Sequence, residues 1–336
     1  MNLQEKRIIT LWLNSGLVLV ALMVIIGGIT RLTHSGLSMV EWKLISGAIP
    51  PLNEVQWQET FEKYQQFPEY QKINKGMSLT EFKAIFFWEY LHRLLGRLIG
   101  LVFIVPFIIF WTKKWFNLKQ KKQLLFLLGL GALQGFLGWF MVKSGLVDVP
   151  AVSHYRLAVH LVTAFILMCY IYWLKLSFNN IEKSSNNTIN KLSKWMIAAL
   201  IIQIIYGAFV AGLKAGYLLP VDGGFFKSVF GYSIRPTNDF NLLNNSFDIQ
   251  AFHRLFAWVV FGISLIIFKK TRNTQLLKTG NIILGLVIFQ IILGITTLLL
   301  RVQLHVATTH QFIAIILLLA TVHLSYQSSE KSLPDA

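Results

Sequence analysis

The chain has 336 residues, of which 54% are hydrophobic and 14% are charged, and its mean hydropathy is +0.56. These values exclude an ordinary soluble protein, whose surface must meet water, and indicate an integral membrane protein. A formal charge of +16 would suggest nucleic-acid binding in a soluble chain, but here we expect the lipid bilayer as partner and no nucleic acid. The single cysteine, Cys169, excludes an internal disulfide and a cysteine-based metal site.

Apolar runs of about twenty residues, the length that crosses the hydrocarbon of a bilayer, occur at eight places. They lie at 10–30, 85–111, 124–142, 157–174, 195–213, 250–268, 281–300 and 306–326. The first run is as long as a full span and shows no small-residue cleavage site, so we expect a retained helix and not a signal peptide. No Arg- and Ser-rich presequence is visible before it, which favours a bacterial inner (plasma) membrane over a mitochondrial one.

The placement of charge predicts the topology. The segments "TKKWFNLKQKK" and "KKTRNTQLLK", which follow the second and sixth spans, carry lysine and arginine but no acid. The long connection at 31–84 instead balances basic against acidic residues. Because positive charge is retained on the cytoplasmic side, we expect both termini in the cytoplasm and the connections at 31–84 and 214–249 outside.

The sequence contains two similar halves. The third and seventh spans share "LGLGALQGFLG" and "LGLVIFQIILG", the fourth and eighth contain "HLVTAFIL" and "HQFIAIIL", and the second and sixth contain "EYLHRLL" and "QAFHRLF". The first and fifth pair through Gly27 and Gly207. Because each half has an even number of spans, both halves should have the same orientation. We predict an all-α membrane protein of two tandem four-helix bundles, 1–178 and 192–336, joined by a cytoplasmic linker at 179–191.

Four histidines occupy equivalent positions in the two halves: His92 and His160 in the first, His253 and His310 in the second. Each lies near the start of a span that runs from outside to inside, so we expect all four at one depth near the outer surface. Histidine is costly in hydrocarbon and usually functional there. Two imidazoles from different helices of a bundle can hold a haem iron from both sides. We therefore predict these four as metal ligands, the alternative being hydrogen bonds that only pack helices.

Other residues fit the same hypothesis. Gly96, one turn after His92, would leave room for a flat macrocycle. Arginines near the helix mouths would pair with haem propionates, although such residues also simply reach toward water. These arginines are Arg31, Arg93, Arg97, Arg156 and Arg254. The paired Gln134 and Gln290 are predicted to form hydrogen bonds between helices.

The repeat breaks at Glu89, whose counterpart is Gln250. Glu89 lies three residues before His92 and so on the same helix face. A buried carboxylate there would give or take protons, which assigns chemistry to the first half. The alternative interpretation is an ion pair with Arg93, four residues on.

Several segments resemble a known family. They are "GGITRLTHSGLSMVEWK", "GAIPP", "FPEY", "MSLTEFKAIFFWEYLHRLLGRLIG", "LQGFLGWFMVKSGL", "YRLAVHL", "GAFVAGLKAG" and "FHRLFAW". In this order, over most of the chain, they are similar to the haem A synthase family, in the branch that includes the mitochondrial enzymes. The resemblance implies an eight-helix oxidoreductase that converts the C8 methyl of haem o to the formyl of haem a by successive hydroxylations. It also implies a role in assembling haem-copper terminal oxidases.

Position by position, the resemblance implies that the first half holds the substrate haem and the second a haem b cofactor. The substrate haem would lie between His92 and His160, near Arg93 and Arg97, and the haem b cofactor would be ligated by His253 and His310. Glu89 matches the functionally important glutamate of the family. The implied partners are haem o synthase and oxidase assembly factors, and a homo-oligomer is left open.

Two features depart from the family pattern. The extracytoplasmic cysteine pair of another branch is absent, and "YLLPVDGGFFKSVFGYSIRP", within the divergent loop 217–249, does not match the expected Asn-Thr-aromatic-Pro segment. Two other hypotheses remain. A non-catalytic di-haem b cytochrome would need the four histidines but not Glu89, and a transporter of parallel repeats would have helices broken at the midplane.

Overall fold

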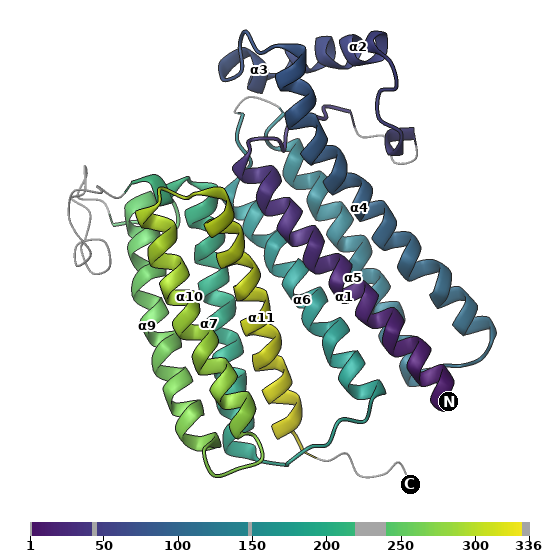
Figure 1. The fold of residues 1–336 in the computed structure, drawn as a ribbon, viewed down its shortest axis with the longest axis vertical. Coiled ribbons are helices and arrows are strands. Elements are labelled where there is room, and N and C mark those ends of the chain that lie inside the picture. The colour runs from purple at the N-terminus through teal and green to yellow at the C-terminus, as the bar shows by residue number, and fades with distance from the viewer. Residues whose placement is uncertain (1, 42–45, 147–149, 219–239, 331–336) are drawn as a thin grey trace. The chain divides into compact units, whose positions relative to one another are not determined.

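The computed structural model describes residues 2–41, 46–146, 150–218 and 240–330, and within these ranges the chain is helical without strands (Figure 1). Eight helices are long and apolar enough to cross a membrane. They are α1 (Leu3–Leu32), α4 (Leu79–Thr112), α5 (Leu118–Lys143), α6 (His154–Phe178), α7 (Asn187–Gly212), α9 (Ser246–Thr271), α10 (Leu277–Leu299) and α11 (Leu304–Ser328). The predicted all-α class with eight spans is confirmed, and the chain is a multi-pass membrane protein. Most of the divergent loop, 219–239, lies outside the described residues.

Polar caps set where several helices begin. Asn2 and Glu5 form a capping box at the start of α1, and Asn117 and Gln120 form one at α5. At α4 the box is made by Ser78 and Glu81, and such reciprocal bonds satisfy backbone N–H groups that have no partner within the helix. Helix α4 therefore begins before the apolar run at 85–111, and its 34 residues span about 51 Å. That length exceeds the roughly 30 Å of hydrocarbon.

The connection before α4 contains two helices that the sequence analysis did not predict, α2 (Glu54–Gln65) and α3 (Pro68–Lys72), with a short 3₁₀ helix, η1 (Ser46–Ala48), before them. They lie at the N-terminal end of α4 (Figure 1). Phe61 and Tyr64 of α2 form a buried cluster with Phe82 and Phe86 of α4. Burial raises the pKa of the Tyr64 phenol above its ordinary value, so this group stays protonated. The projecting start of α4 is thus covered by its own small apolar core.

The chain divides into two compact units, Met1–Leu167 and Met168–Ala336. In the second unit, α7 and α10 each pack against both α9 and α11, which closes a ring of four helices typical of a four-helix bundle. In the first unit, α1 packs on α4 and α4 on α5. The boundary between the units falls inside α6, and α7 begins at Asn187, so the last residues of the expected linker are helical. The assignment of 1–178 and 192–336 to two haem sites stays a prediction.

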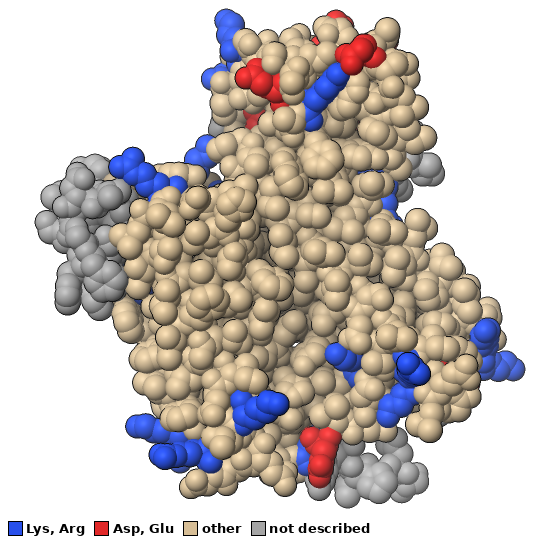
Figure 2. All heavy atoms as spheres, in the orientation of Figure 1, with Lys and Arg blue, Asp and Glu red and all other residues tan. Residues whose placement is uncertain are grey.

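On the face that Figure 2 shows, the charged side chains of the second unit lie at the ends of its helices. Lys269 and Lys270 end α9, and Lys278 lies in the first turn of α10. On the visible face, the flanks of these helices carry almost no blue or red atoms between their ends (Figure 2). An uncharged belt between charged ends is what a bilayer requires of its lipid-facing surface.

The cluster over the start of α4 predicts a local effect of mutation. Phe82 is fully buried, whereas Phe87 on the same helix is 53% exposed. Removing a buried phenylalanine ring costs about 3–5 kcal/mol. We therefore expect Phe82→Ala to release α2 and α3, so that limited proteolysis cleaves within Glu54–Lys72 while the membrane helices stay protected. Phe87→Ala is the matched control, and equal cleavage of both variants would contradict this packing.

Candidate functional site

The two histidines of the first unit come from different helices, His92 from α4 and His160 from α6. Each ring lies against a glycine of the neighbouring helix. A Cβ built on Gly27 of α1 would lie 3.0 Å from His92 Cε1, and one on Gly138 of α5 would lie 3.2 Å from His160 Cε1. Any larger residue would push the imidazoles, so the two glycines set the ring positions.

The second unit repeats this geometry. Its two histidines also come from different helices, His253 from α9 and His310 from α11. A Cβ on Gly207 of α7 would lie 3.1 Å from His253 Cε1, and one on Gly294 of α10 would lie 3.1 Å from His310 Cε1. The histidine alignment inferred from sequence therefore corresponds to one structural arrangement that occurs twice in each unit.

A glutamine holds the backbone of three of these histidines. The amide Nε2 of Gln134 donates to the carbonyl of His160 at 2.9 Å, and Gln290 donates to the carbonyl of His310 at 2.9 Å. The interhelical hydrogen bonds predicted for Gln134 and Gln290 are confirmed. Gln203 donates to the carbonyl of His253, also at 2.9 Å. Gln203 could not be found by comparing the two halves, because the residue four before Gly27 in the first half is a methionine, Met23.

The histidine pairs fit a haem iron better than a metal ion that needs many protein ligands. The Nδ1 atoms of all four rings are buried and have no hydrogen-bond partner among the described residues. Within the same part of the chain, no three His, Cys, Asp or Glu side chains cluster closely enough to hold a metal ion. Structural zinc sites use four protein ligands and catalytic ones three, whereas a haem needs only its axial ligands. The ligand roles themselves stay predictions.

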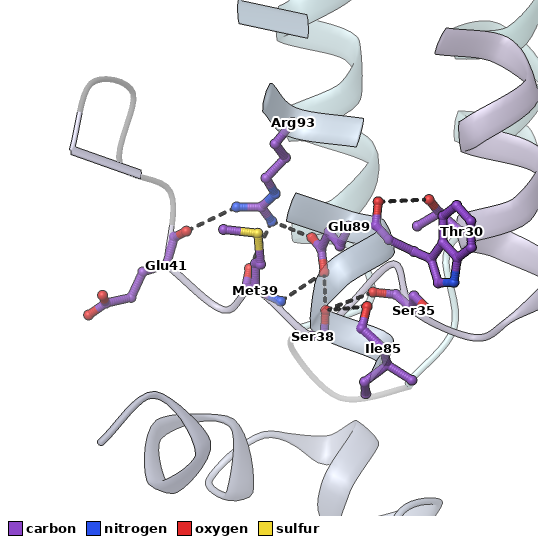
Figure 3. Close-up of polar contacts among 9 residues, drawn as sticks. Thr30, Ser35, Ser38, Met39, Glu41, Ile85, Glu89 and Arg93 are labelled. Atoms are coloured by element: carbon purple, nitrogen blue, oxygen red, sulfur yellow. Dashed lines mark hydrogen bonds and ion pairs between the residues drawn. The ribbon is translucent and has the colours of Figure 1, made fainter. Parts of the chain in front are cut away.

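Glu89 is 3% exposed and lies at the centre of a polar network (Figure 3). Its Oε2 accepts hydrogen bonds from Ser38 Oγ and from the Met39 backbone N–H, both at 2.8 Å. Its Oε1 accepts from Arg93 Nη2 at 2.5 Å. The ion pair with Arg93 that the sequence analysis weighed is therefore present. Ser38 and Met39 could not be identified from sequence, because a loop brings them to the helix.

The counterpart of Glu89 performs a related task in the second unit. Gln250 is buried and its Nε2 donates to the carbonyl of Ala215 at 2.8 Å. Ala215 begins η2 (Ala215–Tyr217), which follows α7 as the Ser38 segment follows α1. Both side chains thus tie the next helix to the segment after the preceding one. Glu89 does so by accepting from N–H and O–H groups, and Gln250 does so by donating to a carbonyl.

Two of the predicted arginines, Arg93 and Arg156, donate hydrogen bonds to backbone carbonyls. Arg93 donates to the carbonyls of Met39 at 2.8 Å and Glu41 at 3.0 Å (Figure 3). Arg156 donates to the carbonyl of Phe140 at 2.8 Å and lies over that ring. Their geometry is that of groups that hold loops and helices together.

Arg97 and Gly96 both lie on α4, just beyond the Glu89 network. Arg97 follows Arg93 by one turn and is half-buried. Gly96 is not open, since a Cβ there would lie 3.1 Å from the terminal methyl of Met23 on α1. The space expected for a macrocycle beside Gly96 is therefore filled by a side chain of the neighbouring helix.

Comparison with known proteins identifies the family. A family model described as "Cytochrome oxidase assembly protein" (COX15-CtaA) matches residues 10–322. The "Heme A synthase" of Flavobacterium johnsoniae is 44% identical over 341 residues, which cover 97% of this chain and 99% of that protein. The "Heme A synthase" of Brucella anthropi is 40% identical over 324 residues, which cover 94% and 90% of the two chains. No solved structure matches the chain. With a match across nearly all of its length, the chain belongs to the COX15-CtaA family of cytochrome oxidase assembly proteins.

Proposed function

We propose that this protein is a heme A synthase, an oxidoreductase that converts the C8 methyl of haem o to the formyl of haem a. Relatives with that name match nearly the whole chain at 40% and 44% identity. The observation that carries the proposal at the level of the site is that buried Glu89 lies on the same helix as His92, within the unit that also contains His160 on α6. Successive hydroxylations of the methyl would give a gem-diol, which loses water to form the aldehyde.

The first unit provides the parts that a substrate haem needs. His92 and His160 offer one imidazole each from two helices, and buried Nδ1 atoms leave the Nε2 atoms as the ligating positions. Glu89 is the group we assign to proton transfer near the reacting methyl, because only the first unit has a carboxylate at this repeat position. Its bonds to Ser38 and Met39 couple that carboxylate to the segment after α1. Arg97 places positive charge on the same helix as His92, suited to a propionate, whereas Arg93 holds Glu89 and the segment that contains Met39 and Glu41.

The second unit fits a haem b cofactor. His253 and His310 would ligate it, and both are fixed twice, by a glycine against the ring and by a glutamine on the backbone carbonyl. When bound, haem b would supply one-electron transfer to carry electrons away from the oxidised substrate. The neutral Gln250 in place of a carboxylate suits a unit that holds a cofactor and exchanges no protons with a substrate.

The same proposal places the protein in a bacterial inner membrane. Both termini would lie in the cytoplasm because Lys-rich connections such as 113–122 are retained there. The histidine pairs would then lie near the extracytoplasmic face. Haem o synthase is the partner class that must supply the substrate, and terminal-oxidase assembly factors would receive haem a. A homo-oligomer is compatible with this arrangement.

The two alternatives from sequence receive less support. The di-haem cytochrome does not account for the enzyme name that the relatives carry. The transporter would have helices broken at the midplane, whereas each of the eight described spans is one continuous helix.

Haem extraction tests the function directly. Membranes of a host that makes haem o but not haem a would be analysed by chromatography with and without this protein. We expect haem a, and a hydroxylated intermediate, only when the protein is present. If haem o persists unchanged while the protein accumulates with bound haem b, the synthase assignment is wrong and the cytochrome hypothesis replaces it.

Glu89→Gln separates proton chemistry from loop anchoring. Glutamine serves at the equivalent position 250, so we expect the variant to fold and keep haem. Loss of a general acid or base lowers rates by about a hundredfold or more, and haem a formation should fall by at least that factor. Ser38→Ala is the control, because it removes one hydrogen bond to Glu89 but leaves the carboxylate. Equal loss in both variants would assign Glu89 to positioning alone.

A pair of glycine variants tests the second unit. Gly294→Ala would press a methyl onto His310, and overpacking by one methyl costs about 1–3 kcal/mol. We expect haem b affinity to fall roughly five- to hundredfold, measured as haem b per purified chain. Gly285 on the same helix is exposed and has nothing within 4 Å of a built Cβ, so Gly285→Ala should keep full haem b. Retention by both variants would contradict the assignment of His310.

A further inference from the structure

The four helix pairs that carry the histidines are not all alike. In three of them, one helix presents Gln-x-x-x-Gly and the other presents His-x-x-x-Ala. These three pairs are Gln134 and Gly138 with His160 and Ala164, Gln203 and Gly207 with His253 and Ala257, and Gln290 and Gly294 with His310 and Ala314. The fourth pair has Met23 and Gly27 on α1, with His92 and Gly96 on α4. Two positions differ together, which indicates a change in how these helices are joined.

The glutamine fixes the backbone of its histidine. The carbonyl of a helical residue already accepts the N–H four residues on, and the glutamine adds a second donor from the facing helix at 2.9 Å. Because little else drives helices together in lipid, such interhelical hydrogen bonds and close glycine contacts are what hold their register. A histidine tied in this way cannot shift along or away from its neighbour without breaking that bond.

His92 lacks this glutamine hydrogen bond, called a tie below. Met23 has no hydrogen-bond donor in its side chain, and among the described residues no side chain donates to the His92 carbonyl. The methionine instead places its terminal methyl against Gly96, 3.1 Å from where a Cβ would lie. Methionine is flexible and adapts to changes in packing. The contact between α1 and α4 at this level is therefore apolar and permits displacement.

We propose that His92 is the axial ligand that yields to admit haem o and release haem a, whereas His160 stays fixed. The inference rests on the proposed function, since a substrate haem must leave after each reaction and a cofactor haem must stay. The unit assigned to the cofactor has two tied histidines, and the unit assigned to the substrate has one tied and one untied. The histidine that lacks the glutamine hydrogen bond is therefore in the unit where a haem must enter and leave.

Rebuilding the missing tie tests this proposal. The double substitution Met23→Gln with Gly96→Ala recreates the arrangement of the other three pairs. Interhelical hydrogen bonds in membrane proteins contribute enough to change an equilibrium by roughly threefold to twentyfold. We expect haem a to pass from the purified protein to excess apomyoglobin more slowly by about that factor. Haem b content should be unchanged, and uptake of external imidazole by the first-unit haem should slow in parallel.

The reciprocal variant provides the matched control. Gln203→Met with Ala257→Gly removes the tie on His253, and we expect haem b to pass to apomyoglobin faster by a similar factor. If Met23→Gln with Gly96→Ala also loses haem b, that variant is misfolded. The proposal is then tested by the haem transfer rates of Met23→Gln alone and of the reciprocal variant. Haem transfer at the wild-type rate in both double variants would overturn the proposal. Transfer is measured without turnover, so failure to form haem a in the host assay would reject the proposed function separately.

Discussion

Close contact between an imidazole and a glycine on the neighbouring helix is the constraint on which the site geometry depends. In lipid, helices gain little from burying apolar surface against one another, so small residues and interhelical hydrogen bonds decide where they meet. Gly27, Gly138, Gly207 and Gly294 each lie against one histidine ring. Each unit contains two such rings, and the two come from different helices. Two imidazoles from different helices of a bundle can hold a haem iron, which is the role proposed for both pairs.

Duplication explains why the same histidine, glycine and glutamine arrangement occurs in both units, and the departures from the repeat explain how the two proposed haem sites would differ. Two departures lie in the first unit, one at Glu89 in place of glutamine and one at Met23 with Gly96 in place of glutamine with alanine. The first adds an ionisable acceptor, held by Ser38, Met39 and Arg93. The second leaves the backbone of His92 without the hydrogen bond that a glutamine gives to the other three histidines. A site with proton chemistry and a less constrained ligand suits a substrate, and a fully tied site suits a permanent cofactor.

The sequence predicted the features that come from long patterns or short helical spacing. Eight apolar runs became eight helices, the interhelical bonds of Gln134 and Gln290 formed, and the spacing of Glu89 and Arg93 gave the ion pair. Features that depend on tertiary contact were not predicted. Helices α2 and α3 are short and gain their stability from packing on α4, and Ser38 reaches Glu89 through a loop. Gln203 was not predicted because its counterpart in the first half is a methionine. The contact that fills the space beside Gly96 was not predicted because the sequence does not show which residue of α1 lies there.

The most direct test of the central claim is the haem composition of two purified variants, His160→Ala and His310→Ala, made in a host that supplies haem o and haem b. The account predicts that His310→Ala loses haem b but still binds haem o, and that His160→Ala loses haem o and haem a but keeps haem b. Loss of the same haem type from both variants, or loss of haem b from His160→Ala alone, would contradict the assignment of substrate and cofactor to the two units.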